Sequence, residues 1–489
     1  MKVVTVYSHS IPKLSCPGGP AGAGLAISTD LLSKVVSVDL ASNRMTFEAG
    51  ITLRQLLDAA AARGLALPTL PTGRESPWRN ARDGLPRQLA LRKGIRGARK
   101  GSGNEAGSPS PYPINGYRAK VVELVEGDED LLAAKVSLGV LGVISQVTLQ
   151  LEPTFKRSVT NRVERDIGFE RTISTFAAAT EFGDIIWYPA QAKVTYRDDV
   201  RLPISASGEG TNDFIGFRPQ PSLIMVGNRA TEELLEATGD SRGKCLLSKL
   251  QVTTLQETGG GLRNNDGSVL EFTGYPVVGN QSDMQTSGSC LTSGEDGLLT
   301  PSIAACLASR RRCIPLTDIA SFIAEVKKLR DLRPSAFCGI ELYYGFLMRF
   351  VRSSTAYLGK TADSVDIDIT YYRSTSLAPR GWTKTCWRRS SRWQSERRVP
   401  QRAREAGAKA TSSGAMTKYD RDGLFSSDWT DAVLGLAGKS PVNAGKGCAL
   451  EGMCICSLDL HCEPDKGYYC KPGLVFPQAR VCRKTGLLH

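Results

Sequence analysis

Residues 136–151 read VSLGVLGVISQVTLQL, and they join two glycines three positions apart to a strand-like alternation. Val147, Leu149 and Leu151 alternate with Thr148 and Gln150, which predicts a half-buried β-strand. Glycine has no Cβ, so the backbone of the turn before this strand can approach a flat ligand closely. The stretch therefore predicts a strand that follows a candidate ligand-binding turn.

The N-terminal part of the chain predicts ordered α+β structure. Residues 35–38 and 45–47 have the composition of two strands of a hairpin. After them, Thr52 and Gln55 have the spacing of a capping box, and apolar residues then recur at helical intervals until Gly64. A hairpin followed by a short amphipathic helix is the expected arrangement.

These stretches together resemble the PCMH-type FAD-binding domain of the vanillyl-alcohol-oxidase superfamily, and within it the aldonolactone oxidases. The resemblance is strongest to the plant-type L-gulonolactone oxidases. Three later stretches, ELYYGFLMRF (341–350), DIDITYYRS (366–374) and DGLFSSDWTD (422–431), are similar to the same branch.

The resemblance implies an α+β protein with three parts. Residues 1–152 are expected to form the PCMH-type FAD-binding domain, N-terminally incomplete and disrupted at 73–111. Residues 153–439 are expected to form an α+β aldonolactone-oxidase substrate domain, disrupted at 380–415. Residues 445–489 are expected to form a small Cys-rich disulfide module.

The implied activity is FAD-dependent oxidation of L-gulono-1,4-lactone to L-ascorbate, or the corresponding oxidation of a related aldonolactone such as D-arabinono-1,4-lactone. The partners are then the sugar lactone and molecular oxygen. No G-x-G-x-x-G stretch follows a strand, so a Rossmann site is not supported. No metal site is expected.

His9 lies in a short small-residue stretch after a strand-like segment, residues 2–6. The resemblance implies that this histidine contacts the flavin and can be its covalent attachment point, with Ser8 and Ser10 beside it. A histidine at a strand end can also serve only as a hydrogen-bonding partner of the local backbone. Both interpretations stay open from the sequence.

The glycine turn matches a family stretch that lies against the flavin and its diphosphate. The resemblance thereby assigns a cofactor-binding role to five residues: Gly139, Val140, Gly142, Val143 and Ile144. The alternative is an ordinary strand entry punctuated by glycine.

Arg349 matches an arginine beside the flavin in this superfamily, where a cation would stabilise negative charge that develops on the reduced ring. An arginine at the surface is the alternative. The family often has a glutamate two positions earlier, where this chain has Leu347. Glu341 is a nearby candidate for the missing carboxylate.

The net charge of +13 would ordinarily suggest an anionic partner, but its distribution argues against nucleic acid. Residues 74–100 contribute +7 and residues 380–409 contribute +8, so the rest of the chain is near neutral at −2. Neither window carries a nucleic-acid-binding motif. We therefore expect no nucleic-acid partner.

Both basic windows stand where the family has functional segments. A glycine-rich phosphate loop is expected between residues 70 and 119, and a histidine- and lysine-bearing stretch between 379 and 416. Residues 73–111 and 380–415 instead lose periodicity, a composition that predicts little packed structure. The alternative function is therefore a catalytically inactive, FAD-poor secreted homologue that acts at most as a binding module.

Six of the thirteen cysteines lie at positions 448, 454, 456, 462, 470 and 482. Their even number in a Gly- and Pro-rich stretch predicts disulfides, whereas zinc would need CxxC pairs or more histidines. Disulfides imply the secretory pathway or the extracellular space, although residues after Met1 contain no signal peptide. No apolar run is long enough to span a membrane, which leaves at most peripheral association.

Overall fold

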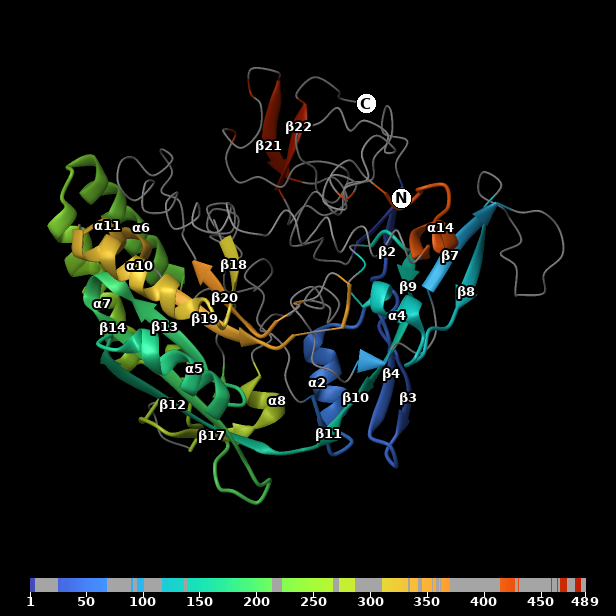
Figure 1. The fold of residues 1–489 in the computed structure, drawn as a ribbon, viewed down its shortest axis with the longest axis horizontal. Coiled ribbons are helices and arrows are strands. Elements are labelled where there is room, and N and C mark those ends of the chain that lie inside the picture. Colours follow the sequence, from blue (N-terminus) through green and yellow to red (C-terminus); the bar gives the residue numbers. More distant parts are fainter. Residues whose placement is uncertain are drawn as a thin grey trace.

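The computed structural model describes a chain with two main antiparallel sheets (Figure 1). The described residues are 1–4, 25–67, 89–90, 95–100, 117–135, 137, 139–212, 222–266, 272–285, 310–332, 335–341, 345–353, 355–357, 360, 362–369, 414–426, 430, 459, 464, 467–472 and 480–484.

The first sheet has the strand order β3 (Val35–Asp39), β4 (Arg44–Glu48), β10 (Gln146–Gln150) and β6 (Leu89–Ala90). Helix α2 (Leu53–Ala61) follows the predicted hairpin. It begins at a capping box in which Thr52 Oγ1 accepts from the Gln55 amide, and the Gln55 side chain accepts from the Thr52 amide. The predicted hairpin, helix and cap are confirmed.

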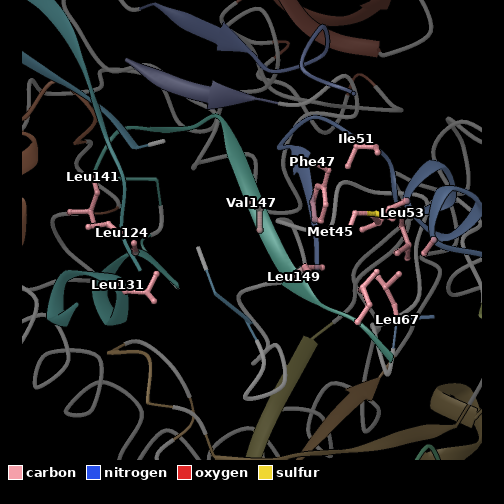
Figure 2. Packing of buried hydrophobic residues seen from close by; sticks show 14 of the residues in the cluster. Met45, Phe47, Ile51, Leu53, Leu67, Leu124, Leu131, Leu141, Val147 and Leu149 are labelled. Atoms are coloured by element: carbon pink, nitrogen blue, oxygen red, sulfur yellow. The ribbon is translucent and has the colours of Figure 1, made fainter. Parts of the chain in front are cut away.

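The core of this first part lies between the sheet and its helices. In Figure 2, Val147 and Leu149 on β10 lie beside Met45 and Phe47 of β4 and Leu53 of α2. A second group comes from the other side of β10, where Leu131 belongs to α4 (Glu129–Ala134). Burial of apolar surface in this continuous cluster stabilises the first part.

The structure corrects the expectation that β10 is buried on one face only. Thr148 is buried, and its Oγ1 lies 2.8 Å from Thr46 Oγ1 on β4. The paired hydroxyls satisfy each other, so the polar side chain of Thr148 can be buried. Alternation therefore identified the strand but misjudged the environment of its second face.

A three-stranded sheet contains β8 (Tyr117–Val122), β7 (Ile95–Lys100) and β9 (Val143–Ile144) in this order. Strands β6 and β7 both lie inside residues 73–111, for which composition predicted little packed structure. The prediction is wrong for these eight residues. Backbone pairing with β8, β9 and β10 needs no apolar alternation, and this explains the difference.

The second sheet has seven strands, all antiparallel to their neighbours (Figure 1). Their order is β17 (Val277–Asn280), β12 (Lys156–Arg165), β14 (Lys193–Leu202), β13 (Asp184–Tyr188), β19 (Phe346–Val351), β20 (Ser364–Ile369) and β18 (Arg310–Pro315).

Helices α5 (Phe169–Ala179) and α10 (Ile319–Leu332) cover one face of this sheet. Phe169 and Ile173 of α5 pack there with Trp187 and Phe346 of the strands. The Trp187 ring is tilted against Phe169 and edge-on to Phe346, with ring centroids 5.5 and 5.8 Å apart. The apolar positions of each strand that face these helices alternate with residues of the opposite face. That opposite face carries most of the polar groups discussed below.

Three further helices lie beside the second sheet (Figure 1): α6 (Ser222–Ala237), α7 (Ser241–Glu257) and α11 (Ser335–Glu341). Val252 of α7 packs against Ile186 and Tyr188 of β13. A disulfide between Cys245 and Cys338 joins α7 to α11. The remaining short elements are β1 (Lys2–Val4), β2 (Ala26–Ser28), β5 (Leu65–Ala66), β11 (Glu152–Pro153), η3 (Pro189–Gln191), β15 (Thr211–Asn212), η4 (Gly259–Gly261), β16 (Leu262–Arg263), α8 (Gln281–Met284), α14 (Ala415–Tyr419), β21 (Tyr468–Pro472) and β22 (Arg480–Lys484).

A chain of buried polar contacts joins the seven-stranded sheet to Leu67 of the first core. Asp199 of β14 accepts two hydrogen bonds from Arg157 of β12, with 2.9 Å between Arg157 Nε and Asp199 Oδ1. Arg157 Nη1 also donates to Gln281 Oε1 (3.0 Å), and Gln281 Nε2 donates to the carbonyl of Leu67 (2.8 Å). In Figure 1, α8, which begins at Gln281, lies between the seven-stranded sheet and α2.

The chain returns to the first part after the second sheet. Ala415 and Tyr419 of α14 are buried in the first core, and Tyr419 donates to Asp130 of α4 (2.7 Å). This segment was assigned by sequence to the substrate domain. The structure shows it packed against the first core, and the predicted domain limits stay predictions.

None of the helices within the described residues is long and apolar enough to cross a membrane. Across the same described ranges, no cluster of three or more His, Cys, Asp or Glu side chains could hold a metal ion.

We predict that Asp199→Ala lowers the free energy of unfolding by about 3–5 kcal/mol, because it leaves the buried Arg157 charge without its carboxylate. Asp198→Ala on the same strand is the matched control. Asp198 also pairs with an arginine, Arg162, but the Asp198 side chain is 37 % exposed. The control should cost at most about 1 kcal/mol. Urea denaturation of both variants checks this, and equal shifts would contradict it.

Candidate functional site

Buried apolar residues of the predicted cofactor turn anchor it in the first core. Val140 and Leu141 are buried in the first core, and the Val140 amide donates to the carbonyl of Ser137 (3.1 Å). Gly139 has φ +70° and Gly142 has φ +129°, conformations that side chains rarely adopt. An added Cβ at Gly139 would meet no atom of the described residues within 4 Å, so these residues leave space beside the turn.

The strand after the turn is fixed on two sides. Val143 and Ile144 form β9, which pairs with β7, and the next carbonyl, that of Ser145, accepts from the Ala49 amide (2.9 Å). The adjacent Gly50 is in such close contact with residues 29–32 that a Cβ would lie 1.8 Å from the Thr29 carbonyl oxygen. Only glycine allows this close backbone approach.

Ser8, His9 and Ser10 lie outside the described residues. The strand before them, β1, is held by the segment that matches the third family stretch. The Lys2 side chain donates to the carbonyl of Phe425, and Asp420 accepts from the amides of Leu424 (2.7 Å) and Phe425. Burial raises the pKa of Asp420. Residues 420–425, distant in sequence, therefore anchor the strand that leads to His9.

Arg349 lies on β19, in the middle of a cross-strand row of charges. Asp184 of β13 and Asp366 of β20 stand directly opposite it on the two neighbouring strands, and Arg197 of β14 stands opposite Asp184. Residues directly opposite in an antiparallel sheet share a face. The row therefore alternates in sign on the face away from α5 and α10.

Two buried oxygen atoms on this face find no hydrogen-bond partner within the described part of the chain. They are Asp184 Oδ1 and Thr195 Oγ1, on adjacent strands. The second Asp184 oxygen accepts from Arg197 Nη1 (2.8 Å). An unsatisfied buried acceptor is costly, and such atoms gather where a ligand or ordered water completes the bonding. The row beside Arg349 thus fits a polar ligand.

The connection between β19 and β20 links the sheet that carries Arg349 to the part that carries the glycine turn. Tyr357 in this connection donates to Glu129 of α4 (3.0 Å), and its amide donates to the Leu132 carbonyl (3.1 Å). Helix α4 ends five residues before Gly139. The two halves of the candidate site are therefore tied together through Tyr357 and α4.

Glu341 does not occupy the place of the missing family carboxylate. It is fully buried, with Oε1 accepting from the Ala190 amide and Oε2 lying 3.3 Å from Ser248 Oγ. Ala190 follows the end of β13, whereas Arg349 pairs with Asp184 at the strand's start. At about 3.3 Å per residue the two ends are more than about 13 Å apart. Leu347, on the face of Arg349, packs against Ile186 and Tyr188.

The sequence missed Asp184 and Asp366, because strand alternation gives the face of a side chain but not the residue opposite it. Two residues of the connection between β19 and β20 were missed for a related reason. They are Tyr357, which contacts α4, and Lys360, whose Nζ donates to Asp366 Oδ1 (2.9 Å). They lie in a connection without periodicity, and only the tertiary structure shows which helix and which carboxylate they contact.

Known proteins resemble this chain over nearly its whole length. It is 42 % identical to L-gulonolactone oxidase 5 of Arabidopsis thaliana over 512 residues, covering 99 % of this chain and 84 % of that protein. L-gulonolactone oxidase 2 of Arabidopsis thaliana is 42 % identical with the same coverage. The chain belongs to the L-gulonolactone oxidase family. This confirms the predicted family, an oxidoreductase that acts on aldonolactones, and FAD as its cofactor.

Two further comparisons support the family and the fold. A family model described as the C-terminal domain of L-gulonolactone oxidase 2-like proteins matches residues 445–484, which include the six predicted disulfide cysteines. The solved structure of a solvent-stable cholesterol oxidase has a TM-score of 0.60 at 12 % identity, covering 88 % of this chain and 90 % of that one. Cholesterol oxidase of B. sterolicum gives 0.59 at 12 %, with the same coverage. At this identity the similarity shows the α+β fold alone.

The residues of this family member fit FAD in the described part of the site. The open turn at Gly139 admits a flat group, and the row around Arg349 offers charge and unsatisfied acceptors. Gly139, Val140, Gly142, Val143 and Ile144 would line the cofactor, with Arg349 approaching from the second sheet. Their cofactor-binding roles stay predictions.

We predict that Glu341→Gln makes stability less dependent on pH. Burial raises the pKa of Glu341 to about 8, far above the value in an unfolded chain. The native state then binds the extra proton, so the original protein loses stability as pH rises from about 4.5 to 8, by at most about 1.4 kcal/mol per pH unit. A glutamine at this position can accept from the Ala190 amide and donate to Ser248 Oγ, and because it does not ionise in this range it loses none of this stability.

Chemical denaturation at pH 5, 6.5 and 8 measures the effect. Glu325→Gln is the matched control, since Glu325 is half exposed on α10 and pairs with Lys328. The advantage of Glu341→Gln over the original protein should grow with pH, and a constant difference would show that Glu341 is ionised in the fold.

Proposed function

We propose that this chain oxidises L-gulono-1,4-lactone to L-ascorbate with molecular oxygen as the electron acceptor. The observation that carries the proposal is the place of Arg349, between two carboxylates on one sheet face, in a chain of this family. The names of the relatives refer to the lactone, which supports the substrate. A Neurospora crassa relative, 30 % identical over 38 % of this chain, is named for D-arabinono-1,4-lactone, a second candidate substrate.

The chain's own residues would bind and orient the reactants. Arg349 supplies a fixed positive charge that favours negative charge developing during oxidation. Asp184 Oδ1, a buried acceptor with no hydrogen-bond partner among the described residues, would accept a hydrogen bond from a lactone hydroxyl that reaches it. When bound, FAD supplies the two-electron oxidation, because it accepts the hydride that the lactone loses.

We also propose that the protein works in the secretory pathway or outside the cell. The disulfide between Cys245 and Cys338 and the disulfide-bonded state of Cys470 both suit an oxidising compartment. Cys470 and Cys482 lie directly opposite each other on β21 and β22, within the predicted disulfide module.

A second candidate function is an inactive, FAD-poor homologue that binds lactones or other partners. The observation that favours it is in the sequence, because residues 73–88 contain none of the glycine-rich pattern that would hold the FAD diphosphate through backbone amides. Absorbance near ~450 nm and lactone-dependent peroxide release by the purified chain decide between the two. Yellow protein that releases peroxide supports the oxidase, and colourless protein without turnover supports the inactive homologue.

We predict that Arg349→Met lowers kcat for the lactone by about 10²-fold, the usual effect of removing one group that stabilises transition-state charge. Arg162→Met is the matched control, because Arg162 is half exposed and pairs with Asp198 and Glu164. Its kcat should stay within about twofold of the original. Steady-state peroxide release measures kcat for both variants. Equal losses of kcat would show that Arg349 has no special role in the site.

We predict that non-reducing peptide mass spectrometry of secreted protein finds the Cys245–Cys338 link together with three disulfides among the six C-terminal cysteines. A small unit with little apolar content needs such cross-links. Free thiols at these positions in protein secreted from cells would contradict both the module and the proposed compartment.

A further inference from the structure

The connection between β19 and β20 touches the first part of the protein while both its ends stay in the second sheet. Tyr357 contacts α4 through its amide, which donates to the Leu132 carbonyl (3.1 Å), and through its hydroxyl, which donates to Glu129 Oε1 (3.0 Å). Its ring packs against the first core. Three interactions therefore hold one residue of this connection on α4.

The same connection also reaches the charge row. Lys360 Nζ donates to Asp366 Oδ1 at 2.9 Å, and Asp366 is only 3 % exposed. Asp366 stands directly opposite Arg349 on the neighbouring strand. The base of the connection is closed by the Ser353 amide, which donates to Asp363 Oδ1 (2.8 Å). Movement of this connection would therefore reach the immediate neighbour of Arg349.

Helix α4 is in turn part of the support of the glycine turn. Leu131 and Ala134 of α4 share the first core with Val140 and Leu141, which anchor the turn. Packed side chains transmit small displacements because protein interiors contain few voids. A displacement of α4 would therefore be transmitted through these packed side chains to the turn at Gly139.

We propose that the connection between β19 and β20 is a strap, in which Tyr357 and Lys360 are positioning residues that hold Arg349 at a fixed place relative to the glycine turn. Tyr357 fixes the strap to α4, and Lys360 fixes it to the carboxylate opposite Arg349. The kinetic consequence rests on the proposed lactone oxidation, since a displacement of about 1 Å at a reacting centre can cost a large factor in rate.

The test removes one hydroxyl at a time from the same helix. Tyr357→Phe deletes the bond to Glu129 and keeps the ring. Tyr419→Phe deletes a bond of the same chemistry, to the adjacent Asp130, but Tyr419 belongs to α14, which lies outside the connection that leads to β19. Glu129→Gln provides a second way to weaken the strap without changing Tyr357. All variants are made in the full chain.

Hydrogen exchange gives the readout that does not depend on turnover. Tyr357→Phe and Glu129→Gln should each speed amide exchange in both α4 and β19. Tyr419→Phe should speed amide exchange in α4 but not in β19. The proposed strap would be wrong if Tyr357→Phe left amide exchange in β19 unchanged. It would also be wrong if Tyr419→Phe increased exchange in β19 as much as Tyr357→Phe does.

Kinetics then test whether the strap acts through Arg349. In protein that turns over lactone, Tyr357→Phe should lower kcat by about three- to tenfold with KM within about twofold. The same substitution in an Arg349→Lys background should cause little further loss, because its target is already displaced. Additive losses would overturn the positioning role. Absence of lactone turnover in the original chain would instead refute the proposed function, and the hydrogen-exchange result would still decide the strap.

Discussion

The buried ion pair between Arg157 and Asp199 is the constraint on which the position of the second sheet relative to the first part depends. Both charges have been taken out of water, a cost that only close mutual contact and further hydrogen bonds can offset. The further bond goes to Gln281, whose amide continues to the Leu67 carbonyl in the first part. The polar groups that make the second sheet stable at this point therefore also fix where the first part sits.

Such a junction suits a site built from two halves. The glycine turn belongs to the first part and Arg349 to the second, so neither half is complete without a defined contact between them. The Arg157 junction restrains one edge of the sheet, near β12 and β14, and Tyr357 restrains the region beyond β19. Contacts at two separated places resist rotation better than contacts at one.

Local sequence patterns predicted the local elements and failed where a distant strand or helix decides the outcome. The Thr52 capping box predicted α2, and the resemblance singled out Arg349. Nothing in the sequence placed Asp184 and Asp366 opposite Arg349, because register depends on the pairing of β13 and β20 with β19. Glu341 was expected near Arg349 from its distance in sequence, but α11 directs it toward Ala190 at the other end of β13.

Strand β7 shows why composition is a weak guide to the disrupted window. Its residues are basic and lack apolar alternation, yet its backbone pairs with β8 and, at Arg96 and Ile95, with β9 of the cofactor turn. A backbone ladder needs amides and carbonyls rather than particular side chains. The turn therefore keeps its strand support, although residues 73–88 do not carry the glycine pattern that the resemblance led us to expect for phosphate. Support for the flavin ring and hydrogen bonding to the diphosphate are separate requirements, and β7 bears on the first of them.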